Sequence, residues 1–308
     1  MSGLVMLIDL RNGRTLSERA DHSKYVVKLT YWQDRTGVWV ATAAWDAKVF
    51  LYRMTISPND DSKLELGSPV GTISLPTNPE CILFVPHPEL PTPVLVLGRR
   101  DSTFLYYYGM PTASQLQPPL LGQQNLAPHS NAWISFTPSA FALSPIDSSV
   151  LAIATSAVPH MKLIITRLLL PPPPSAASAH ASAATRIYTT QASQARESLA
   201  LQDREAAAVM VHCNTMAPQT AYSTPGLAWR PDGSGVWVNG DDGVIRGIES
   251  TTGKVVEHLK GGHEPGTKIR CLWAGWAQEP SDDVREELLV SGGFDKKLIV
   301  WRCGVPAS

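Results

Sequence analysis

Two stretches of the sequence carry the residue types that nucleophilic hydrolases combine, namely a histidine, a hydroxyl and an aspartate. In both, the hydroxyl stands four residues before the aspartate and the histidine lies further upstream. A hydroxyl next to a histidine that a carboxylate orients can act as a nucleophile. A set that occurs twice, however, is better explained by a repeated architecture than by two active sites. The two sets are His22, Thr42 and Asp46, and His263, Ser291 and Asp295.

Other sequence signatures of catalysis are missing. No GxSxG motif is present, and no GxGxxG motif opens a helix after a strand. Gly247 and Gly253 resemble the two glycines of a phosphate loop, but five residues lie between them, whereas a phosphate loop has four. Val255 also stands where a serine or threonine would bind magnesium. We therefore expect a protein without catalytic residues.

Metal and cofactor sites are not expected either. The eight histidines do not cluster at ligand spacings, and the neighbours His212 and Cys213 would point to opposite faces of a strand. The pairs Asp60-Asp61 and Asp241-Asp242 lie in turn contexts, where aspartate caps its own backbone.

The elements that position these residues must belong to an ordinary globular chain. Its 308 residues are 44% apolar and 17% charged, with a formal net charge of −1, which is enough for one large domain or two small ones. The most apolar stretch, Met161 to Leu170, contains Lys162 and Arg167, so no segment reaches the roughly 20 apolar residues of a membrane span. The first residues lack the basic region and the cleavage site of a signal peptide. We expect no membrane association.

Cysteine usage and charge balance restrict the compartment and the partners. Cys81, Cys213, Cys271 and Cys303 are far apart without a CxxC pair, which favours a reducing compartment, the cytoplasm or the nucleus. With 26 basic and 27 acidic residues the chain lacks the positive charge of a strong nucleic-acid binder. We do not expect nucleic acid as a direct ligand.

The pattern of turns and apolar runs predicts a chain of β-hairpins. Few charged residues together with 22 glycines and 25 prolines favour short strands punctuated by turns. The hairpin at residues 288–303 has a strand ending in Ser291, a turn at Asp295 and a second strand ending in Trp301. The hairpin at residues 38–54 repeats these spacings.

At these residues the sequence resembles the WD40-repeat family of β-propellers, whose blades have four strands. In that family a histidine before the first strand, a hydroxyl in the second, an aspartate in the following turn and a tryptophan in the third strand form a hydrogen-bonded structural set. The resemblance implies two such sets: His22, Thr42, Asp46 and Tyr52, and His263, Ser291, Asp295 and Trp301.

Three further blades are weaker copies of the repeat. Residues 226–263 have the strand and turn order, but Val238 and Ile248 replace the hydroxyl and the tryptophan. The blade around Asp101 has no preceding histidine, and the blade at residues 141–170 has no turn aspartate. We predict an all-β propeller of four-stranded antiparallel blades, a single domain over residues 1–308 with five to six blades present.

The strand count predicts a ring that is incomplete. The first residues match the second half of a repeat, so the expected order is two strands, four blades of four, and three strands, which makes 21. A seven-bladed ring has about 28 strands. We therefore expect an N-terminally shortened form of a seven-bladed propeller. The alternative is a six-bladed ring whose terminal strands interlock in an atypical way.

Two segments interrupt the strands. Residues 171–208 begin with a proline run, continue as an alanine- and serine-rich stretch and end in an expected helix at 194–208. We expect this insertion to lie between the third and fourth strands of its blade and to act as a spacer. A docking site for an SH3 or WW domain is the alternative. The acidic segment at 277–287 is expected to be a solvated loop.

The residues next to the turns are the best candidates for function. In a propeller, the residue before each turn aspartate lies on one rim, and aromatic and arginine side chains there are typical of protein interfaces. The alternative is that the aromatic residues pack against neighbouring blades. The partner-binding candidates are Trp45, Arg99, Arg100, Asp241, Phe294 and Lys296.

Three functions are consistent with these features. The first is a non-catalytic scaffold that binds other proteins as a WD40-repeat subunit of an intracellular multiprotein complex. The second is a component of a ribonucleoprotein or chromatin assembly, which would need a basic stripe. The third is a propeller enzyme, which would need polar groups that converge on the centre of the ring. Because propellers carry many functions, the fold alone does not choose among the three.

Overall fold

The computed structural model describes residues 3–54, 65–129, 136–172, 191–277 and 286–303. Almost all regular structure in these ranges is antiparallel β-sheet, and the described part contains a single helix, α2. The predicted all-β class is confirmed. No helix in the described ranges has both the length and the hydropathy that crossing a membrane requires.

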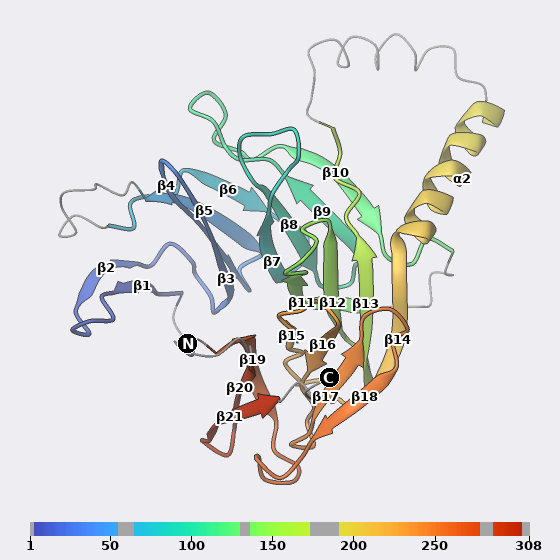
Figure 1. Cartoon of the computed structure of the whole chain (residues 1–308). Coiled ribbons are helices and arrows are strands. Elements are labelled where there is room, and N and C mark those ends of the chain that lie inside the picture. Colours follow the sequence, from blue (N-terminus) through green and yellow to red (C-terminus); the bar gives the residue numbers. More distant parts are fainter. Residues whose placement is uncertain (1–2, 55–64, 130–135, 173–190, 278–285, 304–308) are drawn as a thin grey trace. The chain divides into compact units, whose positions relative to one another are not determined.

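The strands of the described residues form six successive sheets, whose elements are labelled in Figure 1. The first is a hairpin of β1 (Val5–Ile8) and β2 (Thr15–Arg19). Blade 1 contains β3 (Val26–Asp34), β4 (Gly37–Ala44), β5 (Lys48–Met54) and β6 (Gly71–Ser74). Blade 2 contains β7 (Pro79–Val85), β8 (Val94–Arg99), β9 (Phe104–Tyr108) and β10 (Leu120–Asn125). Blade 3 contains β11 (Thr137–Leu143), β12 (Val150–Ser156), β13 (His160–Arg167) and β14 (Val209–Pro218).

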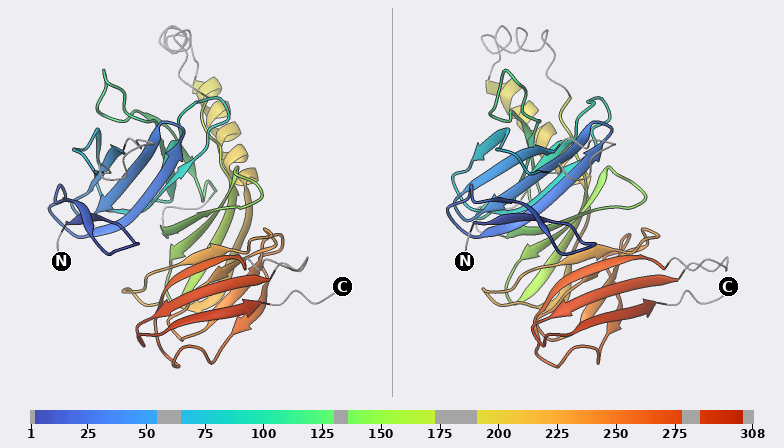
Figure 2. Two further views of the ribbon diagram at one scale, coloured as in Figure 1. Left: turned by 60° about the vertical axis from the view of Figure 1, so that its left-hand side comes forward. Right: turned by 90° about the vertical axis from the view of Figure 1, so that its left-hand side faces the viewer.

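Two more blades complete the described sheets. Blade 4 contains β15 (Leu227–Trp229), β16 (Gly235–Val238), β17 (Ile245–Glu249) and β18 (Val255–Leu259). Blade 5 contains β19 (Ile269–Trp276), β20 (Glu287–Gly293) and β21 (Leu298–Cys303), which lie side by side in red in Figure 2. The protein is therefore an all-β propeller with five blades of mostly four strands. The order of two strands, four blades of four and three strands in the described residues agrees with the prediction.

The chain divides into two compact units. Unit 1 comprises Met1–Asn125 and Leu170–Asp203, and it contains the first hairpin and blades 1 and 2. Unit 2 comprises Leu126–Leu169 and Arg204–Ser308, and it contains blades 3, 4 and 5.

Blades within each unit are held together by apolar faces. In unit 1, residues such as Ala41 and Leu51 of blade 1 share one buried cluster with Phe84 and Leu95 of blade 2. The middle strands are therefore covered on both faces, which explains why β8 begins with the uninterrupted apolar run Val94–Leu97. In unit 2, one cluster joins blade 3 to blade 4, and a second joins Trp237 of blade 4 to Leu289 of blade 5.

The turns that carry the predicted aspartates have the same local geometry in blades 1 and 5. Ala47 and Lys296, each following the aspartate, have φ values of 59° and 62°, in the left-handed region. This conformation is costly for residues with a Cβ atom. The aspartate side chains compensate by accepting a hydrogen bond from a backbone N–H two residues further on, at Lys48 and at Lys297.

The long insertion has the predicted place in the fold. Helix α2 (Gln191–Ala208) begins three residues before the expected start at residue 194 and leads directly into β14, which pairs with β13 (Figure 1). The insertion thus lies between the third and fourth strands of blade 3, as predicted. Residues 173–190, with part of the proline run, lie outside the described residues, and so does Asp60-Asp61.

The prediction of a solvated loop at 277–287 is wrong at its end. Residues 278–285 lie outside the described ranges, but Glu287 is the first residue of β20 and only 2% exposed. A buried carboxylate is tolerated where donors surround it. Arg230 and Trp237, both from blade 4, supply these donors.

Candidate functional site

The four predicted residues of blade 5 form one hydrogen-bonded chain. His263 Nδ1 lies 3.0 Å from Asp295 Oδ2, and His263 Nε2 lies 2.9 Å from Ser291 Oγ. A carboxylate only accepts, so Nδ1 donates, and in that tautomer Nε2 accepts a hydrogen bond from the Ser291 hydroxyl. The Ser291 oxygen in turn accepts a hydrogen bond from Trp301 Nε1 at 2.8 Å. Each residue of this chain therefore fixes the orientation of the next side chain.

Blade 1 contains the same arrangement with a different fourth member. His22 Nδ1 lies 3.0 Å from Asp46 Oδ2, and His22 Nε2 lies 2.8 Å from Thr42 Oγ1. The Tyr52 hydroxyl differs from the Trp301 indole, because it donates to Asp21 Oδ2 at 3.1 Å. Burial raises the pKa of Tyr52 to about 12, which keeps this donor protonated.

The burial of these two sets argues against a catalytic role. His22 and His263 are 5% and 3% exposed, and the hydroxyls of Thr42 and Ser291 belong to fully buried residues. A nucleophile must reach its substrate. These sets instead tie the loop before a blade's first strand to the turn between its second and third strands.

In blades 2 and 4 other polar contacts replace the set. Asp101 of blade 2 is exposed, and the buried Tyr107 hydroxyl donates to Gln124. In blade 4, Arg246 Nη2 lies 2.6 Å from Asp242 Oδ2. In blade 4 the turn aspartate therefore serves its own blade although no histidine precedes it.

A buried polar cluster between blades 4 and 5 was not predicted from the sequence. Glu287 Oε1 accepts a hydrogen bond from Trp237 Nε1 at 2.8 Å, and Glu287 Oε2 lies 2.6 Å from Arg230 Nη2. The Arg230 guanidinium also lies 5.3 Å from the Trp237 ring centre. The sequence gives no signal for this cluster, because Glu287 follows an acidic segment and lies 57 residues from Arg230.

In unit 1, the predicted rim residues form an exposed aromatic and cationic patch. Trp45 is 42% exposed, and its ring packs edge-on against Tyr25 with centroids 5.7 Å apart. Arg100, from the corresponding turn of blade 2, lies 5.8 Å from the Trp45 ring and pairs with Glu80. Arg99 is less available, because it bonds to Thr77 and Tyr106 inside blade 2.

In unit 2 too, some of the predicted rim residues are exposed, while another is held by a neighbouring side chain. Phe294 is 62% exposed, and Arg270 lies 4.7 Å from its ring centre. Lys296 is also exposed. Asp241, in contrast, is mostly buried and pairs with Lys268 Nζ at 3.1 Å, so it fixes a loop instead of presenting a charge. Within each unit, the aromatic residues are thus exposed beside an arginine and are not buried between blades.

Two turn aspartates of unit 2 are held in their ionised form. Burial raises the pKa of Asp242, but the hydrogen bonds and charge of Arg246 outweigh it and leave the pKa below its ordinary value. The pKa of Asp295 is likewise lowered, because the Glu264 amide and His263 outweigh the effect of burial. No three His, Cys, Asp or Glu side chains of the described residues gather into a metal-binding group.

Replacing Asp242 with asparagine is expected to lower the melting temperature at neutral pH by about 2–4 °C. The substitution leaves the buried Arg246 guanidinium without its ionised partner. Because the folded pKa of Asp242 is depressed, its stabilisation is complete above the ordinary value of 3.8 and is lost as the pH falls through the folded value. Calorimetry from pH 7 to pH 2 should therefore show a constant difference between wild-type and variant chains down to about pH 5 and a difference that shrinks progressively below about pH 4. A difference that persists unchanged at the acid end would contradict the assignment.

Comparison with protein families gives the decisive match. The sequence matches the family described as "UCP007778, beta-propeller domain" over residues 1–302. The chain belongs to the UCP007778 beta-propeller family. Membership of UCP007778 agrees with the blade order derived above, because the match extends from the first hairpin into the last strand. Among curated protein sequences none matches this chain.

Solved structures show the same architecture. The Dos1 propeller is similar with a TM-score of 0.54 and 14% identity, over 97% of this chain and 62% of the Dos1 chain. A chain of the mitotic checkpoint complex is similar with a TM-score of 0.54 and 12% identity, over 99% of this chain and 71% of its own. This UCP007778 chain thus spans less than two thirds of the Dos1 chain. At such identities the likeness shows the propeller fold alone.

Proposed function

We propose that this propeller is a non-catalytic scaffold that binds other proteins, built from divergent WD40 repeats. The observation that carries the proposal is the exposure of Trp45 and Phe294 at equivalent turns, each beside an arginine. Tryptophan and arginine are among the residues that contribute most to protein interfaces. The two buried sets of histidine, hydroxyl and aspartate support the relation to WD40 repeats.

The turns of blades 1 and 5 present the aromatic residues in the same way. The Trp45 amide donates to the Tyr25 carbonyl, and the Phe294 amide donates to the Lys268 carbonyl, so the two backbones have corresponding hydrogen bonds. Since the buried sets fix both turns, the aromatic side chains are held in place before a partner arrives. Such preorganisation reduces the entropic cost of binding.

We further propose that the scaffold works inside the cell, in the cytoplasm or the nucleus, as a subunit of a multiprotein complex. Cys81, Cys213 and Cys271 form no disulfide bond among the described residues, which is consistent with a reducing compartment. The membership of one similar chain in the mitotic checkpoint complex agrees with a subunit role, although that partner set belongs to the other protein.

Replacing Trp45 and Phe294 together with alanine is expected to reduce recovery of bound proteins at least about tenfold, since loss of two interface anchors removes several kcal/mol of binding. The measurement is affinity purification of the tagged full chain with quantitative mass spectrometry. Tyr31→Ala is the matched control, because Tyr31 is an exposed aromatic residue of β3 outside the turns.

Three outcomes would contradict the scaffold proposal or its proposed surface. Unchanged recovery by a folded double variant would refute the assignment of these turns. Equal losses in the Tyr31→Ala control would show that any exposed aromatic residue suffices. Loss of all bound proteins after nuclease treatment would instead favour membership of a ribonucleoprotein or chromatin assembly.

A further inference from the structure

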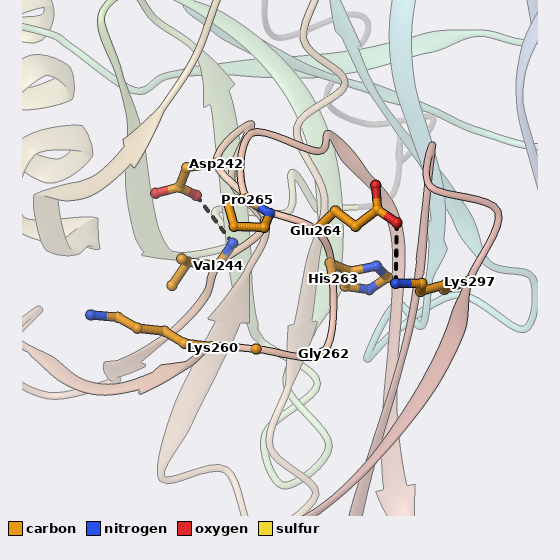
Figure 3. Close-up of a pocket in the computed structure, with 10 residues that line it drawn as sticks. Asp242, Val244, Lys260, Gly262, His263, Glu264, Pro265 and Lys297 are labelled. Carbon is orange, nitrogen blue, oxygen red and sulfur yellow. Dashed lines mark hydrogen bonds and ion pairs between the residues drawn. The ribbon is translucent and has the colours of Figure 1, made fainter.

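A pocket in unit 2 lies beside the turn between β16 and β17 and the loop from β18 to β19 (Figure 3). Its volume is about 380 Å³, near the lower end of the range for small-ligand sites. It therefore has room for a small ligand or for one side chain of a partner. The lining residues are Asp242, Gly243, Val244, Lys260, Gly261, Gly262, His263, Glu264, Pro265 and Lys297.

The charges around this pocket leave one cation without a partner. Asp242 is neutralised by Arg246, and Glu264 lies 3.3 Å from Lys297. Lys260 is exposed and makes no ion pair with any described residue. In Figure 3, Lys260 and Lys297 lie on opposite sides of Gly262 and His263. A ligand in the pocket would thus meet one uncompensated positive charge, that of Lys260, because the exposed Lys297 is paired with Glu264.

The backbone of the same loop offers two more donors. Gly261 has φ of 82°, and the amides of Gly261 and Gly262 donate to no acceptor within the described part of the chain. A Cβ atom at Gly261 would meet open space, so this glycine is required by its left-handed backbone and not by crowding. Successive amides in such a turn form a concave site for anions.

We propose that this pocket binds a phosphate monoester group. The phosphate oxygens accept hydrogen bonds from the Gly261 and Gly262 amides and from the Lys260 ammonium group, while Arg246 and Lys297 neutralise the two carboxylates that line the pocket. A phosphate monoester carries a charge of about −1.5 to −2 at neutral pH and three acceptor oxygens, which suits three donors, one lysine and two amides, better than a carboxylate with two oxygens does. The pocket is independent of the aromatic residues at the turns, so it adds a ligand that the scaffold proposal does not include.

The test is calorimetric titration of the full chain at constant ionic strength with inorganic phosphate, O-phosphoserine and a phosphoserine-containing hexapeptide. We expect saturable binding, weakened at least about tenfold by Lys260→Met, because a hydrogen bond to a charged group is lost. Lys254→Met is the matched control, since it removes the same charge from an exposed position outside the pocket and should change the affinity less than about twofold.

The three probes distinguish the sources of the phosphate group. Tighter binding of the hexapeptide than of inorganic phosphate would support the site and assign it to phosphorylated partners. Equal binding of all three probes would support it and assign it to small phosphorylated molecules. Absence of saturable binding to every probe would overturn the proposal. Equal weakening by Lys260→Met and Lys254→Met would overturn it too, because it would reveal diffuse attraction to the surface.

Discussion

Replacing Glu287 with alanine should lower the free energy of unfolding of unit 2 by about 3–5 kcal/mol. The carboxylate is 2% exposed and bonds to Arg230 and to Trp237 Nε1, so its removal leaves two donors of the interface between blades 4 and 5 without an acceptor. Removing one member of a buried ion pair costs more than the pair itself contributes. Because 23% of the Arg230 side chain is exposed, water solvates part of its charge, and we expect the lower end of this range. Glu287→Gln keeps an acceptor for the indole, and we expect a loss of about 1.5–3 kcal/mol.

Native-state hydrogen exchange with mass spectrometry is the suitable measurement for Glu287, because a chain with two compact units need not unfold in one step. Peptides from β16 and β20 should lose protection, while peptides from blades 1 and 2 should not. The neighbouring Glu286 provides a matched control. It pairs with Arg302, whose side chain is 68% exposed, so Glu286→Ala should cost less than about 0.5 kcal/mol. Equal effects of the two substitutions would disprove the role of Glu287 as a link between blades.

Replacing His263 with alanine should be the next most damaging change, with a loss of about 2–4 kcal/mol. The imidazole is 3% exposed and joins Asp295 to Ser291, and Ser291 in turn positions Trp301. The substitution leaves a ring-sized cavity and two buried polar groups that have lost their partner. Protection against hydrogen exchange should fall in β20 and β21.

Two further histidines make the His263 prediction specific. His258 is exposed at the end of β18, so His258→Ala should leave exchange unchanged. His22→Ala should cause the corresponding loss in β4 and β5, because His22 bonds to Thr42 and Asp46 of blade 1. If His263→Ala left stability unchanged and abolished the binding of a ligand, the histidine would be functional and the structural interpretation would be wrong.

These histidine sets show what local sequence determines. The spacing of hydroxyl, aspartate and aromatic residue fixes their places on one hairpin, because each hairpin has a fixed register across its turn. Ser291 therefore pairs with Ile299 in register, two residues before Trp301, wherever the blade lies. The sequence also predicted the number of strands and the place of the insertion, because both follow from the alternation of apolar runs and turns.

The exposure of the candidate binding residues could not be predicted with the same precision. Trp45, Arg100 and Phe294 are exposed, while Arg99 and Asp241 are held by neighbours within their own units. All five have equivalent or adjacent places in the turns, so their order in the sequence does not separate them. Their availability depends on which side chains from other loops reach them, such as Lys268 for Asp241.

The features that the sequence predicted depend on interactions between residues close together in the chain, whereas the features that it did not predict depend on contacts between distant segments. By itself the sequence determined the class of fold, the blade order and the place of the hydroxyl and the aspartate on each hairpin, since these depend on strand periodicity, turn chemistry and spacing along a hairpin, while the resemblance to WD40 repeats implied the histidine that completes each set. Only the tertiary structure decided that Glu287 is buried against Arg230 and Trp237, and that Lys260 lines a pocket together with Gly261 and Gly262. Burial and electrostatic pairing at these places depend on contacts between segments far apart in the sequence, and no local pattern encodes them.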